Sequence, residues 1–289
     1  MEEKNTDSRK LVFKSGTVEW ANFNTYSCIG GRPENQDAHA FYMMSDAHYQ
    51  IFTVCDGMGG HAGGCVASET ATTTLIESLV RHLKNKDITE AISTAVAEAN
   101  LAVYNKAQDE PSLRGMGTTL TLLIINKEAA YITHVGDSRI YQLRNGRKVF
   151  RTFDHSMVFE QVSKGLLTEE EARLHPRSNI LSKAIGILPD VELTVTKLSY
   201  HEEDRFILCS DGVWNSLPES ELIEMFTNDE DLESMVKTVQ ASVERIGNKN
   251  GSNHDNHTMI AVEMLCDSDF QVTFFSKIKN LFSRRNKQT

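Results

Sequence analysis

Several aspartates in this sequence stand where a carboxylate can serve chemistry. Two segments, residues 51–57 and 206–212, share one pattern, an apolar run that ends in Asp-Gly. A buried strand would carry each aspartate to the edge of the core with its backbone fixed. The glycine would let the chain turn sharply, so that a neighbouring carbonyl also faces a ligand. Asp56 and Asp211 are therefore candidate ligands on rigid supports.

Three further carboxylates occupy comparable places, because Asp137 follows an apolar run, Asp255 precedes one, and Asp37 closes a polar loop. Oxygen ligands without paired cysteine or histidine suit hard cations, Mg²⁺ or Mn²⁺, better than zinc. Aspartates brought close together would repel one another, so their convergence would itself imply bound cations. A single Asp-Gly is usually only a turn signal, and spacing alone does not show that these residues meet.

The elements that position these residues follow from the hydrophobic periodicity. Residues 116–149 alternate strand-like runs with turns so short that they join antiparallel neighbours, which predicts a meander. Period-two and apolar runs predict other strands, and three- and four-residue spacing predicts helices. The expected strands are 17–29, 38–44, 49–55, 191–198, 205–209 and 257–265, and the expected helices are 62–83, 88–107, 219–226 and about 232–246.

We expect these elements to form one α+β domain, because no internal repeat and no Gly/Ser-rich or Pro-rich linker interrupts them. Residues 1–15 are polar and predict a flexible N-terminal arm, so the domain is expected to span 16–266. Residues 153–186 are helical and polar, and Thr168 to Glu171 indicates a capping box before a short acidic helix. We interpret this segment as an insertion over one end of a sheet.

Composition excludes several classes of protein. The 289 residues are 40% hydrophobic and 24% charged, as in globular proteins rather than disordered or fibrous ones. A formal net charge of −10 argues against binding to nucleic acid. Five cysteines without C-x-x-C spacing suit a reducing cytoplasm. The polar start and the lack of an apolar run of ~20 residues predict a soluble protein.

Six motifs of the chain resemble those of the metal-dependent serine/threonine protein phosphatases of the PP2C (PPM) family, in the bacterial form. They occur in the family's order and cover about residues 16–266. The motifs are Arg32-Pro-Glu-Asn-Gln-Asp37, Asp56-Gly-Met-Gly-Gly-His61, Gly115-Met-Gly-Thr-Thr119, Gly136-Asp-Ser-Arg139, Ser210-Asp-Gly-Val-Trp214 and His254-Asp-Asn256. The resemblance implies a four-layer α-β-β-α sandwich, with helices flanking two antiparallel sheets and a two-metal centre at one end.

The resemblance also implies a role for each candidate ligand. Asp56 resembles the residue that bridges both metals, with the Gly57 carbonyl on one of them and Asp211 and Asp255 on the other. Asp37 resembles a carboxylate that acts through metal-bound water.

The remaining candidates surround this centre. Asp137, with Asp211, matches the position that holds a third metal in bacterial members. Arg32 resembles the arginine that grips the substrate phosphate, which fits its planar fork of donors. Residues 154–179 match a mobile flap, where we expect substrate contact. Asp190 lies close behind the flap, and we find no physical reason to count it as a ligand.

The implied activity is Mn²⁺- or Mg²⁺-dependent removal of phosphate from phosphoserine and phosphothreonine in proteins, opposing a bacterial Ser/Thr kinase. A hydroxide bridging the two cations would attack phosphorus in line. A cysteine-based phosphatase is disfavoured because no cysteine lies in a C-x₅-R loop. The alternatives are another two-metal phosphodiester or nucleotide hydrolase and an inactive phosphoprotein-binding relative. The presence of Asp56, Asp211 and Asp255 argues against the inactive relative.

Two positions depart from the eukaryotic pattern of the family. Met58 stands where those enzymes carry a histidine proposed as general acid, and Gln36 stands where they carry a glutamate. The proton donor to the leaving group is therefore unassigned, with a metal-bound water as one candidate. The histidines that could replace it are His39, His61 and His155, although a solitary histidine is more often structural.

The C-terminal segment, residues 267–289, has a different composition. Residues 270–289 contain five basic and no acidic residues, which leaves a net charge of −15 on the rest of the chain. Its apolar residues would share one face of a helix, as in helices that lie on anionic membranes. Contact with a membrane or a partner, packing against the protein's own acidic surface, and a frayed tail are the alternatives.

Overall fold

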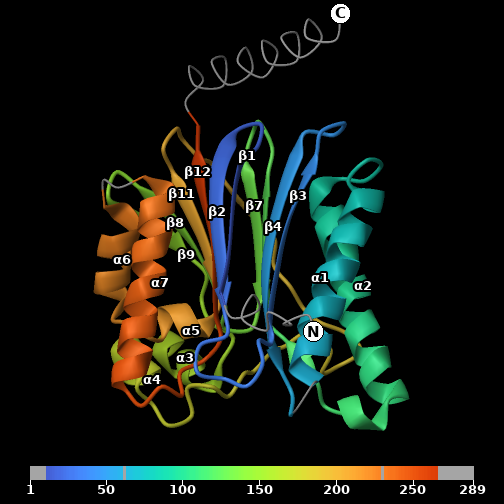
Figure 1. Cartoon of the computed structure of the whole chain (residues 1–289). Coiled ribbons are helices and arrows are strands. Elements are labelled where there is room, and N and C mark those ends of the chain that lie inside the picture. The colour runs from blue at the N-terminus through green and yellow to red at the C-terminus, as the bar shows by residue number, and fades with distance from the viewer. Residues whose placement is uncertain (1–10, 61–62, 229–230, 266–289) are drawn as a thin grey trace, which may run out of the picture.

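Two antiparallel sheets lie face to face in the computed structural model, which describes residues 11–60, 63–228 and 231–265 (Figure 1). Among these residues, the first sheet has the strand order β1 (Leu11–Thr17), β2 (Ala21–Cys28), β12 (His257–Met264), β11 (Arg205–Cys209), β8 (Arg139–Arg144) and β9 (Arg147–Arg151). The second has the order β10 (Thr196–Leu198), β7 (Ala130–Val135), β6 (Leu120–Ile125), β4 (Tyr49–Met58) and β3 (Asp37–Met44), and β5 (Gly117–Thr118) pairs with β4.

Helices cover the outer face of each sheet (Figure 1). The second sheet is covered by α1 (Gly63–His82) and α2 (Ile88–Asp109), and the first sheet is covered by α6 (Glu219–Thr227) and α7 (Leu232–Lys249). The short helices α3 (Met157–Ser163), α4 (Glu169–Arg173) and α5 (Asp211–Trp214) gather at one end of the sandwich, and a 3₁₀ turn, η1 (Pro111–Leu113), follows α2. The predicted four-layer α-β-β-α sandwich is confirmed.

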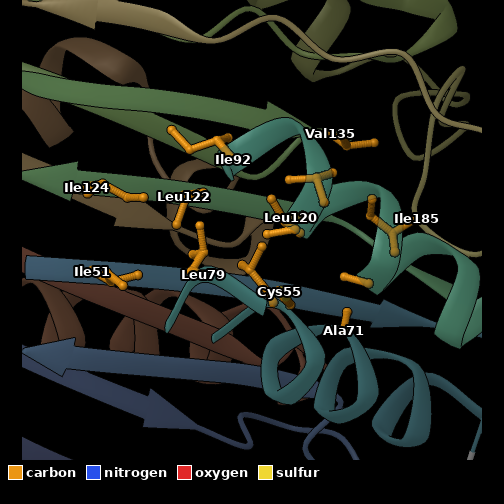
Figure 2. Close-up of a cluster of buried hydrophobic side chains, with 14 of the residues drawn as sticks. Ile51, Cys55, Ala71, Leu79, Ile92, Leu120, Leu122, Ile124, Val135 and Ile185 are labelled. Atoms are coloured by element: carbon orange, nitrogen blue, oxygen red, sulfur yellow. The ribbon is translucent and has the colours of Figure 1, made fainter. Parts of the chain in front are cut away.

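Strand β6 shows how the layers are packed. All six of its residues are buried, because helices cover one face of the sheet and the other sheet covers the opposite face. Leu122 and Ile124 face α1 and α2, as Figure 2 shows, whereas Leu123 and Ile125 face the first sheet. Side chains alternate between faces with a period of two, so a continuous apolar run here means a strand buried on both sides.

Most predicted elements are present, with three corrections. Residues 11–15 were expected in a loose arm but form β1, because each pairs with a residue of β2 while its side chains stay largely exposed. The strand expected at 191–198 is limited to Thr196–Leu198. Residues 1–10 lie outside the described part of the chain.

The third correction concerns the predicted meander. β6 pairs with β7 and β8 pairs with β9, as short loops require. The turn at Gly136 instead carries the chain from the second sheet into the first, so β7 and β8 do not pair. Gly136 has φ +99°, and a β-carbon there would lie 2.9 Å from Cβ of Thr119. Only glycine fits this crossing, which delivers Asp137 between the two sheets.

Candidate metal centre

Asp56 lies near the end of β4 with its backbone held on two sides. Its N–H donates to Oγ1 of Thr119 at 2.8 Å, and its carbonyl accepts from Oγ1 of Thr118 at 2.9 Å. Across the ladder its partner is Asp37, the first residue of β3. The strand therefore presents this carboxylate with little freedom.

Gly57 follows in a space that no side chain could enter. A β-carbon at this position would lie 2.0 Å from the carbonyl oxygen of Gly64 and 2.6 Å from that of Gln36. The Gly57 N–H donates to the same Gln36 carbonyl at 3.1 Å. The Asp-Gly pair predicted from the sequence is thus a close approach of three backbone segments.

Asp211 and Asp255 adjoin the first sheet, because Asp211 begins α5 just after β11 and Asp255 lies just before β12. Nη2 of Arg32 donates to Oδ2 of Asp255 at 2.9 Å, and both side chains are a little over 40% exposed. The guanidinium therefore lies at the solvent edge of the acidic group. Asp137, at the crossing between the sheets, is buried, and its carbonyl accepts from Nε1 of Trp214 at 2.9 Å.

These residues line one cavity of about 560 Å³. Six of the seven predicted site residues line it: Arg32, Asp56, Gly57, Asp137, Asp211 and Asp255. Asp37 lies behind this wall and borders a separate cavity between β1, β3 and α1. Ser210 donates to Oδ2 of Asp37 at 2.8 Å, while Oδ1 is buried and has no hydrogen-bond partner among the described residues.

The carboxylates disturb one another's protonation. Burial, together with the charges of Asp37 and Asp211, raises the pKa of Asp56 well above its ordinary value. Burial, with the charge of Asp211, does the same to the pKa of Asp137. Burial raises the pKa of Asp37 to about 7, and burial with the charge of Asp255 raises the pKa of Asp211 to about 6. Without cations, this group is electrostatically unfavourable.

The donor set fits hard divalent cations. It consists of carboxylate and backbone oxygens at the ends of rigid strands, the ligands that Mg²⁺ and Mn²⁺ prefer. The buried, unpartnered Oδ1 of Asp37 is a polar atom that needs a hydrogen bond, and a water in the centre would supply one. Positive charge at this place would also offset the mutual repulsion of the aspartates.

Other residues fix the loops that carry the site. The sequence showed the motif that contains Asn256 but not the contacts that this residue makes. Asn256 accepts from the Gln36 N–H at 2.8 Å and donates to the carbonyls of Ile29 and Glu34, which fixes the loop before β3 against the loop before β12. Asn179 and Leu181, at the end of the flap, also line the cavity. The sequence could not predict this, because no motif in this segment shows that it lies beside the cavity.

No histidine among the described residues lines the cavity. Met58 does so, at the position where the sequence departs from the eukaryotic pattern. His39 borders the cavity behind Asp37, and burial lowers its pKa to about 4. His155 stacks on His134 with ring centroids 4.4 Å apart and borders a third cavity. Neither His39 nor His155 is placed to donate a proton at the centre, and His61 lies outside the described residues.

Comparison with known proteins agrees with this geometry. The family model described as Protein phosphatase 2C matches residues 26–254. The serine/threonine phosphatase stp of Listeria welshimeri is 34% identical over 235 residues, which cover 80% of this chain and 91% of that protein. The solved structure of the Mycobacterium tuberculosis serine/threonine phosphatase PstP/Ppp matches with a TM-score of 0.73 at 29% identity, over 86% of this chain and 100% of that chain.

A further match is the catalytic domain of the serine/threonine protein phosphatase PstP in complex with two manganese ions, with a TM-score of 0.69 at 27% identity over 89% of this chain and 100% of that chain. Strand-borne carboxylates at one end of a two-sheet sandwich thus define a metal-dependent hydrolase of phosphorylated proteins. The chain belongs to the protein phosphatase 2C family, in its bacterial form, and is a serine/threonine protein phosphatase.

Proposed function

We propose that Asp56, the Gly57 carbonyl, Asp211 and Asp255 hold two Mn²⁺ or Mg²⁺ ions, at which phosphoserine and phosphothreonine of proteins are hydrolysed. The observation that supports this most is the convergence of these groups from both sheets on one cavity. The bound ions supply Lewis acidity and lower the pKa of coordinated water. The chain's contribution is a set of oxygen atoms held at the ends of strands around one cavity.

The remaining site residues would act on substrate and water. Arg32 is half-exposed at the edge of the cavity, and its planar fork can bind two oxygens of a phosphate group. Oδ1 of Asp37 can accept a hydrogen bond from a water in the centre and so orient it. Asp137 and Asp211 would hold a third ion. Burial and the charge of Asp211 raise the pKa of Asp137, and a cation between them would offset this repulsion.

The experiment is hydrolysis of a phosphothreonine peptide by chelated protein to which Mn²⁺ or Mg²⁺ is restored. We expect activity to return with metal in the wild type and in Asp190→Ala, an exposed aspartate outside the cavity. Asp211→Ala should remain inactive with either metal. Activity of Asp211→Ala equal to that of the wild type would refute the proposed ligand set.

We also propose that the enzyme acts in the cytoplasm, opposes a cognate Ser/Thr kinase and makes a peripheral contact through residues 270–289. Among the described residues, no helix has the length and hydropathy needed to cross a bilayer. The five basic residues of the C-terminal segment support attraction to an anionic membrane surface. Deleting residues 270–289 should abolish sedimentation with phosphatidylserine vesicles and leave turnover of a small phosphoester unchanged. Equal sedimentation of both proteins would contradict the membrane contact.

A further inference from the structure

A second group of side chains with metal-ligand chemistry lies under helix α7. Cys28 ends β2 and His257 begins β12, and the two residues are direct partners across the strand pair. Both are buried, with 5% and 0% of their surface exposed. Glu244 reaches them from α7, and His254 approaches from the loop before β12. The mixed sulfur, nitrogen and oxygen set differs from the oxygen-only group around Asp56.

The polar atoms of this group converge on Oε1 of Glu244. This oxygen lies 3.0 Å from Sγ of Cys28, 3.0 Å from Nε2 of His257 and 3.3 Å from Nε2 of His254. The ligand atoms of Cys28, Glu244 and His257 all lie within 4.8 Å of one another. Zinc bonds of about 2.0 to 2.3 Å place tetrahedral ligands about 3.3 to 3.8 Å apart. Sγ of Cys28 and Nε2 of His257 would therefore move away from Oε1 of Glu244 by a few tenths of an ångström, and the other pairs, which lie within 4.8 Å, would take up the same spacing.

Hydrogen bonding within the group does not satisfy His254. Its side chain is 12% exposed, its Nε2 lies at ion-pair distance from Glu244, and its Nδ1 has no hydrogen-bond partner among the described residues. The ring packs directly against the backbone of α7 at Gly247, where a β-carbon would lie 2.1 Å from Cγ of the imidazole. A largely buried imidazole with one unpartnered ring nitrogen is a candidate for a further ligand beside the group.

His257 carries the support that metal-bound imidazoles usually have. Its Nδ1 lies 3.3 Å from the hydroxyl of Tyr26, and the two rings meet edge to face with centroids 5.4 Å apart. Such a partner on the second nitrogen fixes the ring orientation and leaves Nε2 to face the ligand. Here Nε2 faces Glu244.

We propose that Cys28, Glu244 and His257 form a second metal site for a borderline-soft divalent cation such as Zn²⁺, with His254, 3.3 Å from Glu244, as the candidate fourth ligand. One thiolate, two imidazoles and one carboxylate make a tetrahedral set of the kind that selects zinc over magnesium. Burial and the neighbouring Glu244 raise the pKa of Cys28 to about 12, so metal binding here must release a proton from the thiol.

This site and the acidic centre share one loop. His254 and His257 flank Asp255, so a cation bound between β2, β12 and α7 would hold the segment that carries this aspartate. The assignment of the second site does not depend on the ligands of the acidic centre, because it rests on a separate set of side chains.

Co²⁺ provides a readout that the acidic centre cannot imitate, since only a thiolate ligand gives a sulfur-to-cobalt charge-transfer band in the near ultraviolet. Full-length reduced protein, saturated with Mg²⁺, is titrated with Co²⁺. We expect this band to saturate at one equivalent and to disappear when Zn²⁺ displaces the cobalt. Cys28→Ser should abolish the band and weaken Zn²⁺ binding by more than about 100-fold, the upper end of the loss for an outer-sphere partner.

Cys65→Ser is the matched control, because Cys65 is a free cysteine of α1 outside the group, and it should keep the band. His257→Gln retains the thiol and should weaken Co²⁺ binding as well, which provides a second variant if Cys28→Ser does not fold. A wild type without the charge-transfer band, or a band that survives in Cys28→Ser, would mean that these residues form a hydrogen-bonded cluster only.

Discussion

Four aspartates of the candidate metal centre, Asp37, Asp56, Asp137 and Asp211, are costly to ionise in the metal-free protein. The pKa of Asp37 is raised to about 7 and that of Asp211 to about 6, against ordinary values near 4. At pH values between the ordinary and the raised pKa, these carboxyl groups bind more protons in the folded protein than in the unfolded chain. These carboxylates therefore contribute a loss of stability to the metal-free protein as pH rises from about 4 to 7, with a slope of about 1.4 kcal/mol per pH unit for each additional proton bound.

Urea denaturation of chelated protein at pH 5 and at pH 7.5 measures this effect. We expect saturating Mg²⁺ to raise the free energy of unfolding more at pH 7.5 than at pH 5, because the cation relieves a repulsion that is present only when the carboxylates are ionised. Stabilisation by Mg²⁺ that is no greater at pH 7.5 than at pH 5 would show that the carboxylates do not repel one another as the geometry indicates.

Asp37 contributes to the centre without lining its cavity. Replacement by asparagine keeps the shape of the side chain but replaces the carboxylate, whose Oδ1 has no hydrogen-bond partner among the described residues, with a weaker acceptor. We expect Asp37→Asn to lower Mn²⁺ affinity by about 10- to 100-fold, the usual loss for an outer-sphere partner. Isothermal titration calorimetry tests this, with Asp190→Asn as the control that should leave affinity unchanged.

Residues 154–179, the segment expected to form the flap, are joined to the first sheet by a buried ion pair. Arg139 of β8 donates to both carboxylate oxygens of Asp154 at 2.8 and 2.7 Å, and the two side chains are 4% and 1% exposed. The guanidinium also lies 3.5 Å from the centre of the Trp214 ring, whose N–H is bonded to Asp137. The start of the flap and the candidate third-metal position are therefore connected through one arginine.

Removing one partner of a buried pair leaves the other charge uncompensated, at a cost of about 3 to 5 kcal/mol. We expect a loss of this size in Arg139→Met, measured by urea denaturation, and partial recovery in the double variant Arg139→Met/Asp154→Leu. Lys183→Met breaks an exposed pair with Glu192 and should cost less than about 1 kcal/mol. Equal losses in the two single variants would contradict the anchoring role of Arg139.

Local patterns predicted the elements better than the connections between them. The Asp-Gly ends of β4 and β11 were visible because burial of a strand and its following turn are encoded within about seven residues. β1 was missed because an exposed edge strand has no apolar face to reveal it. The crossing at Gly136 was missed because a short connection has the same sequence pattern whether the strands that it joins pair or separate.

The group around Glu244 was even harder to predict from local sequence patterns. Cys28 and His257 lie 229 positions apart in the sequence, and only the pairing of β2 with β12 brings them together. Neither residue stands in a spacing typical of zinc ligands. Chemistry assembled from distant strands can be recognised only after the topology is known.

At the scale of the whole molecule, the acidic centre lies across the boundary between the two sheets. Asp37 and Asp56 belong to the second sheet, Asp211 and Asp255 adjoin strands of the first, and Asp137 stands where the chain crosses between them. Elsewhere the sheets are joined by an apolar layer that includes Phe52, Leu123, Phe206 and Ile260, among others. Cations at the centre would therefore connect the two sheets at the end where carboxylates replace apolar contacts.

A cation that binds only the folded state stabilises it by about 2.7 kcal/mol at a concentration 100 times its dissociation constant. We expect Mg²⁺ at that concentration to raise the free energy of unfolding by this amount in the wild type and by almost nothing in Asp56→Asn. The metal-free Asp56→Asn protein should be at least as stable as the metal-free wild type, because the substitution removes one of several buried negative charges. Urea denaturation of both proteins with and without Mg²⁺ gives all four values. Equal stabilisation of both proteins by Mg²⁺ would place the cation elsewhere than at the junction of the sheets.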